Sequence, residues 1–441
     1  MSDRKRQIRL LLWAYFLLVI FEGALRKWVL PQLATPLLVI RDPICIAALY
    51  LGYKYLLQNI WVWGFVGVGL LAIPLAVGLG HGSLSVALFG ARILILHFPL
   101  IFLFPAVFDR SDVWHFSKVT LLIAIPMTIL LAMQFYLPQS HFVNVGVGGE
   151  GTSVFSGAGG RHRSAGTFSF SNGVACFYSL AAALFVGWLV SGPRPLPKWL
   201  WVSGGCLVIA MPLAISRAIA FQYAITFFFA ALAAGISPRL LKNILPASLG
   251  LAIVVACASQ SAVFQTAMEA FSSRWEAATQ AEGEGDGVAG VVENRIIGYG
   301  VVSAFESIDT VPVAGLGIGM GTNAGAKLLT GSSHAFLIAE GGWGATIGEL
   351  GPLLGLLMIL YRGFLTASMT LRSLLAVKLG NPLPLILGSV GIHSMFMGNT
   401  SQPTALGFIV LSGGLMLAAM KKPRPVSGLP VSRPKRRSTH A

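Results

Sequence analysis

Hydrophobic residues form long runs along the whole chain, and short polar segments separate these runs. Most runs reach about 18 residues, the length at which a helix can cross the hydrocarbon core of a bilayer. They do not alternate apolar with polar positions, as the strands of a membrane barrel do. The pattern predicts an all-α polytopic membrane protein with about twelve transmembrane helices. The expected spans are residues 8–25, 36–53, 59–80, 84–108, 116–137, 171–191, 199–216, 218–236, 244–263, 336–360, 382–398 and 404–420.

Lysine and arginine are unevenly distributed between the segments that connect these spans. With the N-terminus placed in the cytoplasm, 21 of the 31 Lys and Arg residues, Arg362 among them, fall in cytoplasmic segments. This is the bias that the positive-inside rule describes. An even number of spans leaves the C-terminus in the cytoplasm as well. We expect one polytopic domain over residues 1–420 and a basic tail over 421–441 that is attracted to anionic lipid headgroups.

Composition agrees with this interpretation and narrows the chemistry. Charged residues make up 11% of the chain, against about 25% in a typical soluble domain. The net charge of +15 comes mostly from the cytoplasmic segments and the tail, so we do not expect a nucleic-acid partner. The four cysteines lie at scattered positions inside apolar runs. They are expected to be small buried side chains rather than disulfides or metal ligands, and the sequence indicates no cofactor.

Ten cations do not follow the positive-inside rule, because they lie within spans or on the extracytoplasmic side. An arginine in hydrocarbon is costly and normally has a partner or a function. Glu22 and Arg26 have the i, i+4 spacing of a helical ion pair, and Arg41 adjoins Asp42, so pairing is expected there. Arg92 lies about a third of the way into the fourth span. The ten are Arg26, Lys27, Arg41, Arg92, Arg161, Arg163, Arg217, Arg274, Arg295 and Lys327.

Four of these cations favour an anionic ligand. Arg161, Arg163, Arg217 and Arg295 have no acidic neighbour at helical spacing that could pair with them. Arginine binds phosphate and carboxylate groups with two parallel N–H donors, which makes it suited to such a ligand.

Two connections are long, residues 138–170 and 264–335, and both are expected on the extracytoplasmic side. The first ends in RHRSAGTFSFSNG at residues 161–173, where Gly166 is expected to let the chain turn into the membrane. The second contains ENRIIGYGVVSAF, whose spacing predicts an amphipathic helix at the membrane surface with Arg295 near its start. It also contains GLGIGMG, which follows no strand-and-helix unit and therefore does not predict a dinucleotide site.

His334 lies where the second long loop meets the tenth predicted span. A histidine at a membrane interface is commonly a polar cap, and the alternative is a general acid or base that works near neutral pH. Glu340 and Glu349 flank glycines in the same span. Glu349 lies deep enough to require a partner or a proton.

Four short motifs occur in a fixed order over residues 150–360. They are RHRSAGTFSFSNGVA, AISRAIAF, NRIIGYGVVSAFESIDTVPVAGLGIG and SSHAFLIAEGGWGATIGELGPLLG. Together they resemble the O-antigen ligase and Wzy-type polymerase superfamily of bacterial inner membranes. The chain departs from that family at Ala335, where an asparagine is common, and in FEGALRKWVLP at residues 21–31, which has no evident counterpart.

The resemblance implies a GT-C-like helical fold and an inverting, metal-independent glycosyltransferase without cofactors. Its donor would be an oligosaccharide on undecaprenyl diphosphate, and its active site would face the periplasm. Arg217 and Arg295 would bind the diphosphate and His334 would activate the acceptor hydroxyl. The expected partners are membrane lipids, a chain-length regulator and export machinery. Further candidate binding residues are Arg161, Arg163, Arg92, Arg274 and Glu340, with Trp275 or Trp343 against a sugar ring.

Three functions remain open at this point. A polysaccharide polymerase would transfer the glycan onto a lipid-linked repeat unit, and an O-antigen ligase would transfer it to a lipid A-core acceptor. A lipid-linked oligosaccharide transporter would also contain intramembrane arginines. Transporters often have repeated halves, whereas the charge here gathers toward one face, so the sequence favours a transferase.

Overall fold

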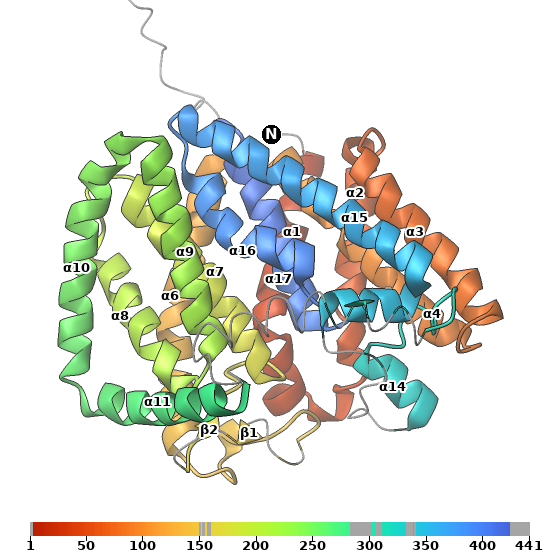
Figure 1. Ribbon diagram of the computed structural model, residues 1–441, viewed down its shortest axis with the longest axis horizontal. Coiled ribbons are helices and arrows are strands. Elements are labelled where there is room, and N and C mark those ends of the chain that lie inside the picture. Colours follow the sequence, from red (N-terminus) through yellow and green to blue (C-terminus); the bar gives the residue numbers. More distant parts are fainter. Residues whose placement is uncertain are drawn as a thin grey trace, which may run out of the picture.

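The computed structural model describes residues 3–149, 151, 155–156, 160–282, 302, 304–305, 308, 311–331, 338 and 341–423. The described chain is a bundle of helices with one small pair of strands (Figure 1). Nine helical segments among these residues are long and apolar enough to cross a membrane. Three shorter apolar helices, Lys198–Leu213, Leu383–Met397 and Pro403–Ala419, coincide with the remaining predicted spans. The architecture is that of an all-α, multi-pass membrane protein.

The elements follow one another as α1 (Asp3–Ala24), the π-helical turn η1 (Leu25–Val29), η2 (Pro31–Leu33), η3 (Pro36–Val39), α2 (Asp42–Leu56), α3 (Ile60–Gly78), α4 (Leu84–Arg92), η4 (Ile93–His97), α5 (Leu100–Val107), α6 (Arg110–Tyr136), η5 (Phe142–Asn144), β1 (Phe155–Ser156), β2 (His162–Arg163), α7 (Ser171–Ser191), α8 (Lys198–Leu213), α9 (Arg217–Ile236), η6 (Pro238–Leu240), α10 (Leu241–Ser259), α11 (Ala262–Glu282), α14 (Asn323–Thr330), α15 (Gly342–Lys378), α16 (Leu383–Met397) and α17 (Pro403–Ala419).

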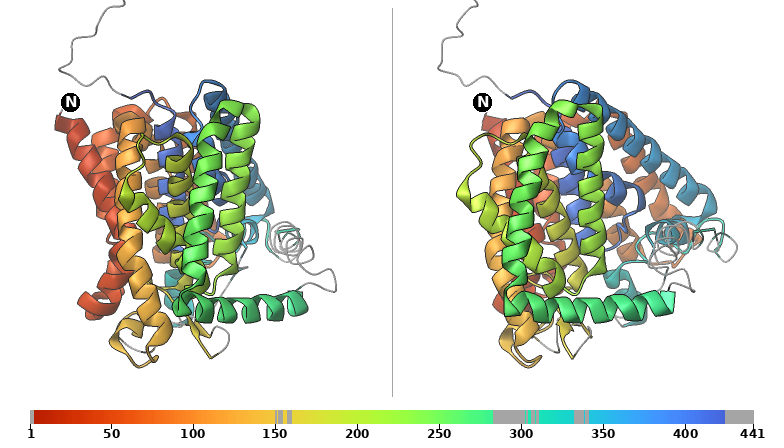
Figure 2. Two further views of the ribbon diagram at one scale, coloured as in Figure 1. Left: turned by 90° about the vertical axis from the view of Figure 1, so that its left-hand side faces the viewer. Right: turned by 60° about the vertical axis from the view of Figure 1, so that its left-hand side comes forward.

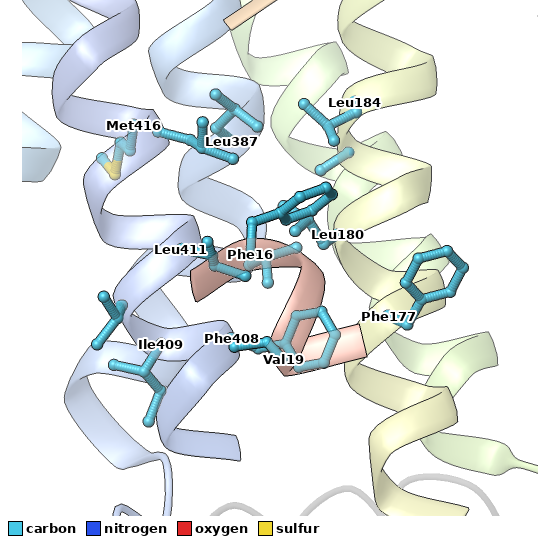
Figure 3. Packing of buried hydrophobic residues seen from close by; sticks show 14 of the residues in the cluster. Phe16, Val19, Phe177, Leu180, Leu184, Leu387, Phe408, Ile409, Leu411 and Met416 are labelled. Atoms are coloured by element: carbon cyan, nitrogen blue, oxygen red, sulfur yellow. The ribbon is translucent and has the colours of Figure 1, made fainter. Parts of the chain in front are cut away.

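Helices α7, α16 and α17 form the centre of the bundle. Of the most apolar stretch of α7, 94% is buried, against 6% of that of α10, which lies at the periphery. A helix that is apolar on every face must be buried or face lipid, and these two helices represent the two cases. Leu180 and Leu184 of α7 meet Leu387 of α16 and Phe408 of α17 in this core, and α1 adds Phe16 (Figure 3).

The two ends of the bundle differ. Helix α1 begins at one end, and the strands β1 and β2 and the helices α11 and α14 lie at the other, which we call the loop end (Figures 1 and 2). Both long predicted loops, 138–170 and 264–335, contribute to the loop end. Helix α11 runs across the ends of α8 and α10 there, nearly perpendicular to them (Figure 2).

Helix α11 corrects the sequence prediction, which treated residues 264–282 as loop. Helix α10 ends at Ser259, four residues before the predicted end of the ninth span, and α11 begins at Ala262. Ala267, Ala270 and Phe271 form its buried face, while glutamine, serine and glutamate occupy other positions. This helix is amphipathic, and its mixed composition hides it from a search for continuous apolar runs.

Helix α15 also differs from the prediction, which placed a span at residues 336–360. It continues to Lys378 and bends sharply at Gly351, whose φ of 78° and ψ of 169° are essentially restricted to glycine. The following Pro352 lacks the N–H that would continue the helical hydrogen bonds. The bend separates a short limb, residues 342–350, from a long limb, residues 352–378.

Arg362 lies within the long limb of α15 and not in a segment that connects two spans, which is where the sequence analysis placed it. Its side chain is 2% exposed, and its guanidinium donates to the carbonyl oxygens of Met395 at 2.7 Å and Gly398 at 2.9 Å. These carbonyls lie at the C-terminal end of α16, where the last carbonyls of a helix have no partner within the helix. Arg362 therefore satisfies a helix end inside the bundle.

All four cysteines are free. Cys45 is buried, as predicted, whereas Cys257 is exposed on α10. The prediction of buried cysteines was wrong at this position, because an apolar run can face lipid as well as protein.

Candidate functional site

The stretch RHRSAGTFSFSNG lies at the loop end and carries two of the predicted site residues. His162 and Arg163 form β2, which pairs antiparallel with β1. Residues 164–169 are buried, and α7 begins at Ser171. Asn172, the second residue of α7, donates a hydrogen bond to the side chain of Gln402 just before α17. This stretch therefore connects the surface strands to the two central helices.

Arg161 lies over aromatic rings at the C-terminal end of α6. Its guanidinium carbon is 5.2 Å from the ring centroid of Phe135 and 5.0 Å from that of Tyr136. Such an arrangement attracts the cation to the negative face of each ring. A ring holds a guanidinium group through its charge and does not use its N–H donors as a carboxylate would.

Side chains of two helical segments hold the backbone of Gly166 by hydrogen bonds. Its φ of 56° is left-handed, as expected for a glycine at which the chain turns. Its N–H donates to Oε1 of Gln134 at 2.7 Å, and its carbonyl oxygen accepts from Nε2 of the same side chain at 3.3 Å. Nζ of Lys27 donates to the same oxygen at 2.7 Å.

Arg217 is the first residue of α9 and is largely buried. It follows a strained turn in which Ile215 has a φ of 44°, unusual for a β-branched residue. One turn further along α9, the ring of Phe221 lies 5.4 Å from that of Trp275. Helix α11 thereby places Trp275 beside the first turns of α9, and Arg274 is the residue that precedes it on α11.

The structure does not bring Arg92 to this group. Its guanidinium is 9% exposed and pairs with Asp42 at 2.5 Å. The same oxygen of Asp42 lies 3.1 Å from Nε2 of His97, and the other nitrogen of that ring lies 3.0 Å from the hydroxyl of Tyr15. Arg92 is part of a buried network between α1, α2 and α4–η4.

Arg26 and Arg41 also have an acidic partner, because both pair with the buried carboxylate of Glu22. Glu22 lies 3.8 Å from Arg26, which confirms the predicted i, i+4 pair. The other carboxylate oxygen of Glu22 lies 2.8 Å from Nε of Arg41, so Arg41 pairs with Glu22 and not with the adjacent Asp42. Consecutive side chains on a helix point in different directions, which is the physical reason for this difference.

The buried carboxyl group of Glu349 has hydrogen-bond partners, as the sequence analysis expected for its position within a span. Its Oε1 accepts from the backbone N–H of Gly321 at 2.9 Å and from the hydroxyl of Ser401 at 3.2 Å. The GLGIGMG loop packs here against the bend of α15, with Leu316 and Gly317 donating to the carbonyls of Gly348 and Glu349. The spacing of its glycines reflects close backbone packing at three left-handed positions, Gly315, Gly317 and Gly319.

Glu349 and Arg362 line a narrow cavity of about 20 Å³ between α4 and α15. A space of this size accommodates about one water molecule. Trp343, a candidate for stacking on a sugar, donates its indole N–H to the carbonyl of Phe396 at 2.9 Å, which anchors the short limb of α15 to the end of α16.

Three predicted site residues, His334, Arg295 and Glu340, lie outside the described residues, as does most of the amphipathic helix expected around Arg295. Within the described part of the chain, no three His, Cys, Asp or Glu side chains are grouped as metal ligands. Comparison with known proteins finds no family model, no curated protein and no solved structure that matches the chain.

Four arginines of the described residues lie on elements at the loop end. Arg161 and Arg163 lie in or beside β2, Arg217 begins α9, and Arg274 lies on α11, all at one end of the bundle (Figures 1 and 2). Helices α7, α9 and α17 also begin at this end, and the N-terminus of a helix carries partial positive charge. The described residues therefore place four of the predicted arginines toward the end of the bundle where these helices begin.

Two residues of this site were missed by sequence reasoning. Lys27 and Gln134 hold Gly166, yet neither lies in a motif of the resembled family. The signal for Lys27 was present in FEGALRKW, a charged segment at the end of a predicted span without an assigned task. Gln134, a lone amide near the end of the fifth span, gave no comparable signal.

Proposed function

We propose that the protein is a polysaccharide polymerase of the bacterial inner membrane. It transfers a glycan from undecaprenyl diphosphate to a lipid-linked repeat unit at the periplasmic face. In this proposal the chain crosses the membrane twelve times, with both termini in the cytoplasm and a GT-C-like arrangement of helices. The loop end of the bundle then faces the periplasm.

The observation that carries this proposal is a location. Four arginines, Arg161, Arg163, Arg217 and Arg274, lie on elements at the loop end of the bundle. Breaking the bond between an anomeric carbon and the diphosphate leaves negative charge on the departing phosphate oxygens. Fixed guanidinium groups stabilise such charge in a site of low dielectric constant. Three separate elements, β2, α9 and α11, carry or adjoin these arginines.

His334 and Arg295 complete the proposed mechanism on the basis of sequence. His334 takes the proton of the acceptor hydroxyl, and the oxygen of that hydroxyl attacks the anomeric carbon from the face opposite the diphosphate. The new glycosidic bond forms as the bond to the diphosphate breaks, which inverts the configuration. Arg217 and Arg295 bind the departing diphosphate, while Arg161 and Arg163 support it or contact the sugar.

The test uses purified full-length protein in proteoliposomes with undecaprenyl-diphosphate-linked repeat units and EDTA. We expect the wild-type protein to form lengthened lipid-linked chains, separable on a gel. His334→Ala should form none, and His115→Ala, which removes an exposed histidine of α6, should behave as wild type.

Each other outcome identifies a different error. Normal chain length in His334→Ala contradicts the assignment of the base. Transfer only to a lipid A-core acceptor identifies an O-antigen ligase. Movement of the lipid-linked glycan across the bilayer without any new glycosidic bond identifies a transporter.

A further inference from the structure

The segment FEGALRKW at residues 21–28 is not accounted for by the resemblance or by the proposed chemistry. It forms the end of α1 and the π-helical turn η1. Such a turn contains an extra residue and often occurs at functional sites. Here it lies against residues 166–169, more than 130 positions away in the chain.

Two hydrogen bonds connect the two segments, and a third joins residues 166–169 to Ile20, which directly precedes the first segment. Nζ of Lys27 donates to the carbonyl of Gly166 at 2.7 Å, and the hydroxyl of Thr167 donates to the carbonyl of Ile20 at 2.6 Å. Nη1 of Arg26 donates to the hydroxyl of Ser169 at 3.1 Å. Side chains from both segments therefore act as donors across one contact.

Gly23 allows this contact to be as close as it is. A Cβ atom at this position would lie 2.6 Å from the backbone carbonyl carbon of Phe168 and 2.6 Å from the backbone nitrogen of Ser169. Since both neighbours are backbone atoms, they cannot rotate away as a side chain can. Any larger residue at position 23 would push the two segments apart.

Lys27 is the unusual member of the contact. Its side chain is 2% exposed, and in the part of the chain that the structure describes no carboxylate lies within ion-pair distance of its ammonium group. A buried cation without a counter-ion is unfavourable. The ring of Trp28, whose centroid lies 4.6 Å from Nζ, offsets part of this cost, and the bond to Gly166 is the hydrogen bond that orients the ammonium group.

Lys27 binds the carbonyl of Gly166, and Gly166 closely follows Arg161 and Arg163 in the chain. Gln134 binds both the N–H and the carbonyl of Gly166, and the next two residues of α6, Phe135 and Tyr136, lie beneath the guanidinium of Arg161. Lys27, Gly166, Gln134 and Arg161 thus form one continuous set of contacts.

We infer that Ile20, Gly23, Arg26 and Lys27, which we call the α1 clamp, are positioning residues for the arginines of the first long loop. Lys27 fixes Gly166, and Gly166 sets the path of the preceding residues 161–165. The clamp acts through Arg161 and Arg163 and does not itself touch the substrate. Its catalytic meaning rests on the proposed function, whereas its effect on the loop does not.

The test compares Lys27→Met with wild type in full-length protein in nanodiscs. Methionine keeps the length and apolar stem of lysine but cannot donate to Gly166. We expect amide hydrogen exchange in residues 161–168 to rise about tenfold while α6 and α7 stay protected. We also expect binding of undecaprenyl diphosphate to weaken about tenfold, through KM and not kcat.

Matched variants separate this role from simple stability. Lys54→Met removes an exposed lysine at the far end of α2 and should change neither measurement. Lys27→Arg retains a donor and should recover part of the lost affinity. If Lys27→Met does not fold, Thr167→Val removes the hydroxyl that binds Ile20, and Thr167→Ser restores it.

The outcomes distinguish the two proposals. Unchanged exchange in Lys27→Met overturns the clamp, and raised exchange with unchanged binding overturns its positioning role. If wild-type protein does not bind undecaprenyl diphosphate at all, the proposed function fails. The exchange measurement then still decides whether Lys27 fixes the loop.

Discussion

Cations that look alike in the sequence differ in the partners that the structure shows, as a comparison of Arg26, Arg41 and Arg92 with Arg161 makes clear. In the paired cluster, Arg26, Arg41 and Arg92 each lie within 4 Å of the carboxylate of Glu22 or Asp42. In the rim cluster at the loop end, the described contacts of Arg161 are with aromatic rings. The other members are Arg163, Arg217 and Arg274.

The difference teaches that a misplaced positive charge has two explanations, which only the fold separates. The carboxylate that binds Arg92 is 50 residues away in the chain, so no local pattern could have revealed it. Removing a carboxylate from the paired cluster should cost stability, while changing an arginine of the rim cluster should cost activity.

The largest effect is expected for Asp42→Asn. Removing this charge leaves the buried guanidinium of Arg92 without its counter-ion, which should lower the free energy of unfolding by about 3–5 kcal/mol. Thermal unfolding in detergent measures this as a fall in Tm. Arg9→Gln breaks the more exposed pair with Asp112 and should cost at most about 1 kcal/mol. An equal Tm for both variants would show that burial does not make the Arg92–Asp42 pair more important to stability than the exposed pair.

The next effect is expected for Arg217→Lys. Lysine keeps the charge but loses the planar fork that binds two phosphate oxygens. We expect kcat for polymer formation to fall about 10²–10³-fold, with Tm unchanged. Full activity in this variant would indicate that charge attraction alone is sufficient and that the rim does not need forked donors.

The smallest effect is expected for the double variant Asp42→Leu with Arg92→Leu. Replacing a whole buried ion pair by apolar residues is often nearly neutral, and the loss of the bond between His97 and Asp42 should add a cost of about 1–3 kcal/mol. Tm should therefore lie above that of Asp42→Asn, and polymer formation should persist. Loss of activity with a normal Tm would indicate that Arg92 binds the substrate, as the sequence analysis expected.

The sequence predicted the helical class and the positions of most spans, because a bilayer imposes one length on every apolar helix. It missed α11 because an amphipathic helix has no continuous apolar run. It misplaced the span at α15 because the backbone angles of Gly351 depend on the GLGIGMG loop packed against it.

The candidate site was predictable in part. The spacing of Glu22 and Arg26 gave their pair, and the extracytoplasmic location expected for residues 138–170 grouped Arg161 with Arg163. The contact between Lys27 and Gly166 spans 139 positions, so it required the tertiary structure. The roles of His334, Arg295 and Glu340 remain predictions.

Arg362 has a consequence for how the chain is made. The ribosome synthesises this residue 36 positions before Gly398, so one of its acceptors does not yet exist when the long limb of α15 leaves the tunnel. An arginine near the middle of an apolar helix costs about 2.5–3.5 kcal/mol when the translocon releases it into lipid alone. We therefore expect the long limb of α15 and α16 to enter the membrane together as one hairpin, since only then does Arg362 have both of its acceptors.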